Sequence, residues 1–262
     1  MTIAEYIKIL ISVEEYSFSI DELRSKLEKS ETAIKRELDR LTEKGEIVSL
    51  RKGFYIIITP RYSNAKKLPI QLYCEKLFKY LGRNYYVGLF SAAKFHGASH
   101  QQIQRDYLIT EKPKLNDILK KSIDIRFFTS SHWSSKNIQL KKSDAGIYKI
   151  SSPALTIVDL IHYQTKLGGI NRIITTIEEL VEEVTVVDLV ELLKWYPYKS
   201  TLQRFGYILQ YLEMNIDFQE LIFNQLRLGK MFPVLLSPKS NEKPGAASNK
   251  WKVDVNVKIE NN

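Results

Sequence analysis

Cationic and hydroxyl side chains gather between residues 30 and 52, and their types suit contact with a nucleic acid. Lys and Arg neutralise phosphates and hydrogen-bond base edges, and hydroxyl groups bind phosphate oxygens. On a helix over residues 30–45, the apolar Ile34, Leu38 and Leu41 share one face, and the opposite side presents polar and cationic residues. The residues that we predict to contact DNA are Ser30, Thr32, Lys35, Arg36, Arg40, Arg51 and Lys52.

The neighbouring sequence predicts the elements that would position these side chains. Residues 2–13 have the apolar spacing of a helix, and Ser19 with Glu22 forms the S-x-x-E pattern that begins a second one. Ser30 is a favourable N-cap residue for the third helix, which we expect to end at Gly45. Two apolar runs, 46–50 and 54–59, then flank Arg51-Lys52-Gly53, which indicates a hairpin with a basic tip.

Three helices and a hairpin form the order of a winged helix-turn-helix, whose third helix enters the DNA major groove. Thr32, Lys35 and Arg36 occupy the N-terminal half of that helix, from which base edges are contacted, whereas Asp39 and Glu43 come later. The alternative is a solvated helical surface or a protein-binding module, because Lys, Arg and Glu are good helix formers anywhere. The placement of the charges favours DNA.

The net charge of +9, from 39 Lys and Arg against 30 Asp and Glu in 262 residues, also favours an anionic partner. Its distribution is uneven, because residues 1–80 carry +3 and residues 94–149 carry +6. The middle of the chain could therefore form a second basic patch, which either extends the DNA-binding surface or serves the second domain. Its members are Lys112, Lys114, Lys120, Lys121, Lys141 and Lys142.

Catalytic and metal-binding motifs are missing from the sequence. No phosphate-binding Gly-rich loop occurs, and His96 and His100 lack a third metal ligand nearby. Asp106 and Asp124 lie in predicted strands, as nuclease acids do, but no D-x-[DE]-x-K pattern surrounds them. We therefore predict neither an enzyme nor a cofactor or metal; a nucleic-acid enzyme targeted by the winged helix is the least favoured hypothesis.

Composition points to a soluble cytoplasmic protein. The lone Cys74 cannot form an internal disulfide, and residues 1–20 lack the layout of a signal peptide. The longest apolar stretch, 54–58, is far shorter than the roughly 18 residues of a membrane span.

Two domains are predicted, at residues 1–82 and 83–262. The first is a winged helix-turn-helix DNA-binding domain, with a linker over 60–69 and a closing helix over 70–82. In the second, helices and short strands alternate, which predicts an α+β domain with a mostly antiparallel or mixed sheet packed by helices. Residues 251–259 alternate strictly between apolar and polar types, which predicts a strand, and residues 231–236 could pair with it.

Three stretches of the second domain, together with the first-domain helices and the wing Arg51-Lys52-Gly53-Phe54-Tyr55, resemble the AbiEi family of antitoxins. They are residues 85–97 (YYVGLFSAAKFHG), residues 148–160 (YKISSPALTIVDL) followed by Gly168-Gly169, and residues 251–256 (WKVDVN). The order and spacing carry the likeness, which covers most of the chain. One difference is that Ala154 and Leu155 stand where the family usually has a charged pair.

The resemblance implies an antitoxin of a bacterial type IV toxin–antitoxin, or abortive-infection, system. The winged helix would bind inverted repeats upstream of its own operon and repress it. The C-terminal domain would counter a nucleotidyltransferase-like toxin without a stable complex, and a protein that is monomeric in solution could place two copies on the DNA. The alternative is a winged-helix regulator whose second domain senses a ligand or partner, with no toxin. A downstream nucleotidyltransferase-like gene would distinguish the two.

Overall fold

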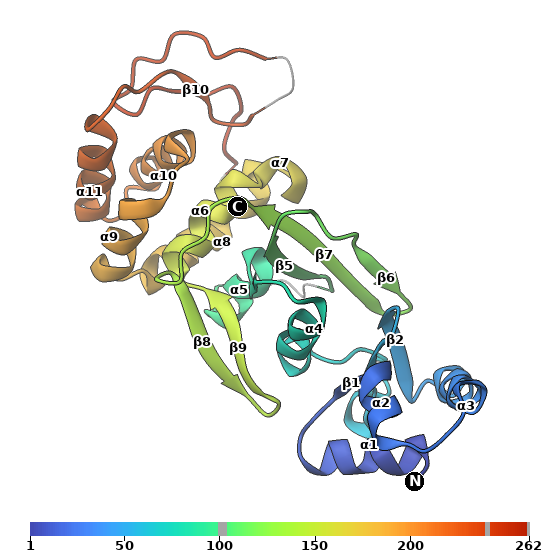
Figure 1. Ribbon diagram of the computed structural model, residues 1–262. Helices are drawn as coiled ribbons and strands as arrows, with labels where there is room; N and C mark the ends of the chain where they lie inside the picture. The colour runs from blue at the N-terminus through green and yellow to red at the C-terminus, as the bar shows by residue number, and fades with distance from the viewer. Residues whose placement is uncertain (99–103, 239–241, 261–262) are drawn as a thin grey trace. The chain divides into compact units, whose positions relative to one another are not determined.

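The computed structural model describes residues 1–98, 104–238 and 242–260, which form two compact units (Figure 1). Unit 1 contains residues 1–86, 104–130 and 140–149, and unit 2 contains the described residues of 87–103, 131–139 and 150–262. The predicted first domain, 1–82, thus lies within unit 1 together with two later segments. The boundary at residue 82, as a division between functional modules, stays a prediction.

The first six elements of unit 1 have the order expected of a winged helix-turn-helix. They are α1 (Ile3–Ser12), β1 (Ser17–Ser19), α2 (Ile20–Lys26), α3 (Glu31–Glu43), β2 (Ile47–Arg51) and β3 (Phe54–Ile57). Capping boxes begin both α1, at Thr2, and α2, at Ser19, because each side chain there satisfies a free backbone amide. Strand β1, which the sequence did not predict, pairs with β3 and completes a sheet of order β1-β3-β2.

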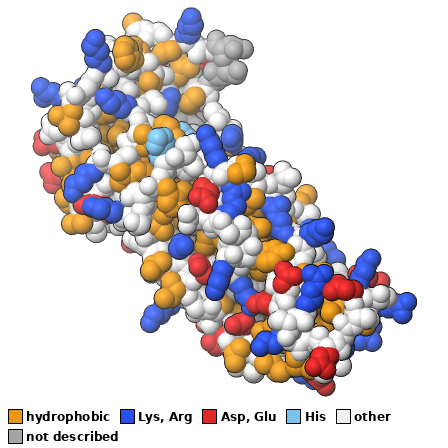
Figure 2. Space-filling model, viewed as in Figure 1, with side chains coloured by type: hydrophobic (Ala, Val, Ile, Leu, Met, Phe, Trp, Pro, Cys, Tyr) orange, Lys and Arg blue, Asp and Glu red, His pale blue; other side chains and the backbone are white. Residues whose placement is uncertain are grey.

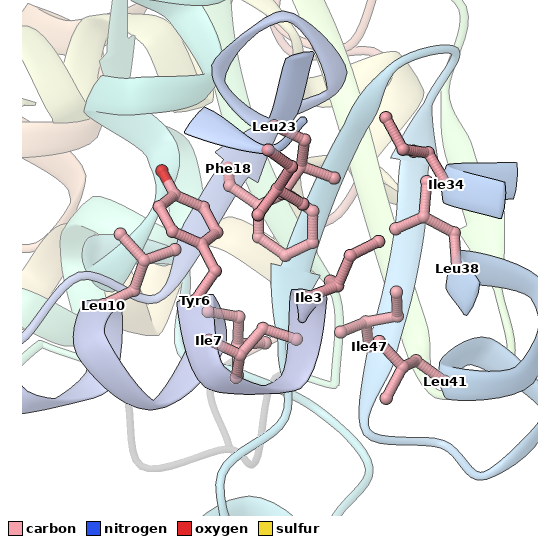
Figure 3. Close-up of a cluster of buried hydrophobic side chains, with 12 residues drawn as sticks. Ile3, Tyr6, Ile7, Leu10, Phe18, Leu23, Ile34, Leu38, Leu41 and Ile47 are labelled. Carbon is pink, nitrogen blue, oxygen red and sulfur yellow. The ribbon is translucent and has the colours of Figure 1, made fainter. Parts of the chain in front are cut away.

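Apolar side chains from all three helices form the core beneath this small sheet (Figure 3). Ile34, Leu38 and Leu41 of α3 are at most 3% exposed, as the helical spacing predicts. They face Ile3 of α1 and Ile47 of β2 in the same cluster. The burial of this stripe determines which side of α3 is left exposed.

The chain then forms two short 3-10 turns, η1 (Pro60–Tyr62) and η2 (Ile70–Leu72), and helix α4 (Cys74–Leu81). A six-stranded sheet of order β6-β7-β5-β4-β9-β8 follows. Its strands are β4 (Tyr85–Val87), β5 (Asp106–Glu111), β6 (Ile118–Lys120), β7 (Ile123–Ser130), β8 (Ile138–Ser143) and β9 (Gly146–Ser151). Strand β5 is parallel to β7, and β6 is antiparallel to β7, so the predicted α+β class with a mixed sheet is confirmed.

Unit 2 is mainly helical. Its helices are α5 (Leu89–Phe95), α6 (Pro153–His162), α7 (Gln164–Leu167), α8 (Ile170–Glu183), α9 (Val186–Trp195), α10 (Lys199–Tyr211) and α11 (Ile216–Arg227). Ser152 caps α6 and Pro153 occupies its first turn. Within the described parts of the chain, no helix has the length and apolar character that crossing a membrane requires.

The prediction of one long final strand over residues 251–259 is wrong. Only β11 (Val253–Asp254) forms, and it pairs in parallel with β10 (Val234–Leu235), the region predicted as its partner. Trp251 and Val253 are buried, but Val255 is 47% exposed. The alternation therefore reflects buried anchors in an irregular segment rather than one continuous buried face.

Candidate nucleic-acid interface

Helix α3 exposes the side chains that were predicted to read DNA. Ser30 is its N-cap, and the Ser30 hydroxyl accepts a hydrogen bond from the amide of Ala33 at 3.3 Å. Thr32 and Arg36 are exposed on the side opposite the buried stripe, and Lys35 is exposed on its flank. Ser30 therefore positions the helix, while Thr32, Lys35 and Arg36 are left facing solvent. Arg40, two turns from Thr32, is also exposed.

Two acidic groups of α3, Glu31 and Glu37, are paired within unit 1. Arg24 binds Glu31 through two hydrogen bonds, at 2.7 and 2.9 Å, and this contact lowers the pKa of the Glu31 carboxyl. The Lys29 ammonium forms an ion pair with the Glu37 carboxylate at 2.6 Å. Among the described residues, no carboxylate forms an ion pair with Lys35 or Arg36. The N-terminal half of the exposed face therefore presents uncompensated positive charge, which suits an anionic ligand.

The hairpin tip is held by the rest of unit 1 instead of projecting freely. Gly53, at φ +77°, has no room for a side chain, because a Cβ there would lie 2.7 Å from the Tyr80 hydroxyl. That hydroxyl donates a hydrogen bond to the Lys52 carbonyl at 3.0 Å, and the Ile20 amide donates to the Gly53 carbonyl at 2.8 Å. Tyr80 was not predicted as part of the site, since nothing local in the sequence connects it to the hairpin.

The two basic residues of the tip differ in their surroundings. Arg51 donates a hydrogen bond to the Asn116 carbonyl, and its guanidinium lies 5.3 Å from the centre of the Phe127 ring. Burial lowers the pKa of Arg51, although nearby Asp117 opposes the effect. The Lys52 side chain is exposed. Of the predicted pair, only Lys52 is therefore free to meet phosphate without breaking a contact within the protein.

The second predicted basic segment belongs to unit 1, together with α3 and the hairpin. Four of its lysines are exposed around β6, namely Lys112, Lys114, Lys120 and Lys121, and Lys142 is exposed on β8 beside the half-buried Lys141. Lys120 also donates a hydrogen bond to the Ser49 carbonyl of β2. Unit 1 holds 25 Lys and Arg against 17 Asp and Glu, whereas unit 2 holds 14 against 13. The net positive charge is thus concentrated in the unit that contains α3 and the β2–β3 hairpin.

The acids considered for a nuclease are engaged by cations. Asp106 pairs with Lys67 at 2.9 Å, and Asp124 pairs with Arg105 and Arg126 at 2.8 and 2.7 Å. No three His, Cys, Asp or Glu side chains lie together as metal ligands within residues 1–98, 104–238 and 242–260. His100 of the His96–His100 pair lies outside the described residues. The His96 ring forms a 2.8 Å hydrogen bond with the Ser151 carbonyl.

Comparison with solved structures finds a protein of similar fold. A crystal structure of the RV2827C protein from Mycobacterium tuberculosis matches with a TM-score of 0.63 at 14% sequence identity, covering 95% of this chain and 89% of that one. At such low identity the match shows similarity of fold alone. No curated protein matches the chain significantly.

Comparison with family models identifies the sequence relationship. Residues 86–211 match the family described as the AbiEi antitoxin C-terminal domain. The matched region includes two of the three second-domain stretches on which the resemblance rests, residues 148–160 and nearly all of residues 85–97. Residues 86–211 of this chain therefore form a C-terminal domain of the AbiEi antitoxin family.

Proposed function

We propose that this antitoxin represses its own operon by binding inverted repeats through α3, and counters a nucleotidyltransferase-like toxin through its C-terminal domain. The observation that carries the DNA-binding half is the pair Lys35 and Arg36, exposed and without carboxylate partners among the described residues. The family match supports the antitoxin half. Repression and toxin neutralisation would together form a type IV, abortive-infection system that defends the cell against phage.

The basic segment around β6 supports a DNA surface wider than α3. Its lysines share unit 1 with the winged helix, and the hydrogen bonds Lys120–Ser49 and Arg51–Asn116 join the segment directly to β2. Phosphate contacts fix a protein on the duplex without reading sequence. We therefore assign these lysines to the DNA backbone and Arg36 to a base edge.

Co-expression tests the antitoxin half. We expect a nucleotidyltransferase-like gene downstream, which should arrest growth when induced alone, and the full-length chain should restore growth. Because a type IV antitoxin acts without a stable complex, the two proteins should not co-purify. Failure to rescue, with operator binding intact, would favour the alternative of a ligand- or partner-sensing regulator.

Reversing the charge of the basic segment in K112E/K114E/K121E is expected to weaken operator binding at least tenfold while leaving rescue intact. Each lost phosphate contact should also reduce the slope of log K against log salt by about 0.9. Lys120 is left unchanged because its ammonium group bonds the Ser49 carbonyl. Gel-shift titrations at about 50 and 200 mM salt measure both quantities. Loss of rescue with unchanged operator affinity would instead place the segment in the antitoxic function.

Replacement by Ala should have different effects at the two wing residues, on DNA affinity at Lys52 and on stability at Arg51. Lys52→Ala should weaken binding to all DNA sequences alike and lower the salt slope by about one unit. Arg51→Ala should instead lower the free energy of unfolding by about 1–3 kcal/mol, since its guanidinium bonds Asn116 and packs on Phe127. Urea unfolding and gel shifts on both variants test the distinction. Equal stability of the two variants would contradict the structural role of Arg51.

A further inference from the structure

Five exposed cations surround the end of α11 in unit 2. They are Lys199, Arg227, Lys230, Lys250 and Lys252, and together they are named the C-terminal basic patch. They come from three segments that are far apart in the sequence: the start of α10, the end of α11 with its following turn, and the residues around Trp251. Local sequence patterns therefore give no sign of the patch.

Contacts with residues 223–231 bring these segments together. The Lys199 ammonium lies beside Gly229, since a Cβ added to Gly229 would be 2.2 Å from it. The Lys252 ammonium donates to the Met231 carbonyl at 3.1 Å. Arg227 and Lys250 both lie over the Phe223 ring, at 5.8 and 5.7 Å from its centre.

The charge of the patch is not compensated by acids. Among the residues that the structure describes, no carboxylate forms an ion pair with any of the five cations. The pattern differs elsewhere in unit 2, where Lys136 and Lys194 both pair with Glu191 at 2.9 and 2.6 Å. Unit 2 as a whole is nearly neutral, so this local excess is a distinct feature of its surface.

Two aromatic residues belong to the segments that carry these cations. Phe232 follows the end of α11 and is 69% exposed, while Phe223 is half-buried beneath Arg227 and Lys250. Figure 2 shows Lys, Arg and hydrophobic side chains interspersed over the part of unit 2 that carries α11 and β10. Leaving a Phe ring in water is unfavourable unless a partner covers it.

Unpaired cations in the same segment as an exposed ring suit one class of ligand better than others. Protein interfaces are depleted in Lys, which is four of the five cations here. Phosphates would be neutralised by the cations, and an unpaired base could stack on a ring with little dependence on sequence. Bases within a duplex are already stacked and cannot do so, which favours a single strand.

We propose that the C-terminal basic patch binds a single-stranded nucleic acid, with its cations on the phosphates and a base stacked on Phe232. This goes beyond operator recognition, because it gives unit 2 a nucleic-acid partner of its own, separate from the double-stranded operator of unit 1.

The test measures binding of the full-length protein to fluorescent 15-nucleotide oligo(U) RNA and oligo(dT) DNA by anisotropy. Charge reversal in K230E/K250E should weaken binding at least tenfold and lower the salt slope by about one to two units. The matched control K94E/K166E makes the same charge change on α5 and α7, outside the patch, and should bind like the wild type. Binding of RNA alone, or DNA alone, would identify the sugar that the patch prefers; binding of neither would overturn the proposal.

Two further variants test stacking and location. Phe232→Leu should weaken binding about tenfold, whereas Phe232→Trp should retain it, because only Trp keeps a ring for the base. The reader-helix variant K35E/R36E should lose the operator but keep the oligonucleotide. Loss of oligonucleotide binding in K35E/R36E, with K230E/K250E unaffected, would assign the activity to unit 1 and refute the proposal. A urea-unfolding midpoint of K230E/K250E equal to that of the wild type, followed by circular dichroism, would show that the variant is folded.

Discussion

Replacing Arg36 by Ala should weaken binding to the operator by about 1–3 kcal/mol, which is roughly 5- to 150-fold in affinity. The guanidinium projects from the N-terminal half of α3, is exposed, and has no carboxylate partner among the described residues. An Arg in this position of a recognition helix can bind a guanine through two parallel hydrogen bonds. Its removal should therefore reduce discrimination between operator and unrelated DNA as well as affinity.

The matched control is Lys44→Ala. Lys44 is the C-cap of the same helix, is exposed, and carries the same charge, but it lies at the end that would leave the groove. Gel shifts with operator and scrambled duplexes should show Lys44→Ala close to the wild type on both. Equal, sequence-independent weakening by the two substitutions would mean that α3 contributes only charge and does not read bases.

Helix boundaries in this chain were predictable because their determinants are local. Ser19, Ser30 and Ser152 each cap a helix through an amide three residues away, and that spacing can be read directly from the sequence. The exposed face of α3 follows likewise from the spacing of its buried residues. The candidate DNA-contacting residues of α3 were therefore predicted together with the helix.

Features that depend on distant partners were not predictable. Strand β8 (Ile138–Ser143) is only partly buried and shows no clear alternation, so its pairing within the sheet determines it. Arg51 was predicted to meet DNA, but its contact with Asn116 spans 65 residues of sequence. The C-terminal basic patch likewise combines three separate segments. In each case a contact between distant segments, which periodicity does not encode, decides the role of the residue.

The segment around Trp251 illustrates both points. Its strict alternation predicted a long strand, whereas the structure uses Trp251 as a buried anchor against α10. A Cβ added to Gly206 of α10 would lie 2.1 Å from the indole, so only glycine lets the ring approach the helix this closely. The indole amine donates to Gln210 at 2.7 Å, and Gln203 donates to the Trp251 carbonyl at 2.8 Å.

Trp251→Ala is therefore expected to lower the free energy of unfolding by about 3–5 kcal/mol. The substitution leaves a cavity against Gly206 and removes the hydrogen-bond partner of the Gln210 side chain. Gly206→Ala should also destabilise the protein, by about 1–3 kcal/mol or more, because a rigid, fully buried ring cannot move aside easily. Urea unfolding followed by circular dichroism measures both changes.

Val255→Ala is the control, since Val255 lies in the same segment but is 47% exposed and should change stability by no more than about 0.5 kcal/mol. A continuous strand over residues 251–259 would instead place Val253 and Val255 on one buried face. Their Ala variants would then lower the free energy of unfolding by similar amounts. The anchored arrangement predicts a large effect at Trp251, an intermediate one at the buried Val253, and almost none at Val255. Since α10 lies within the region matched to the antitoxin family, the Trp251 variant should also lose rescue at temperatures where the wild type retains it.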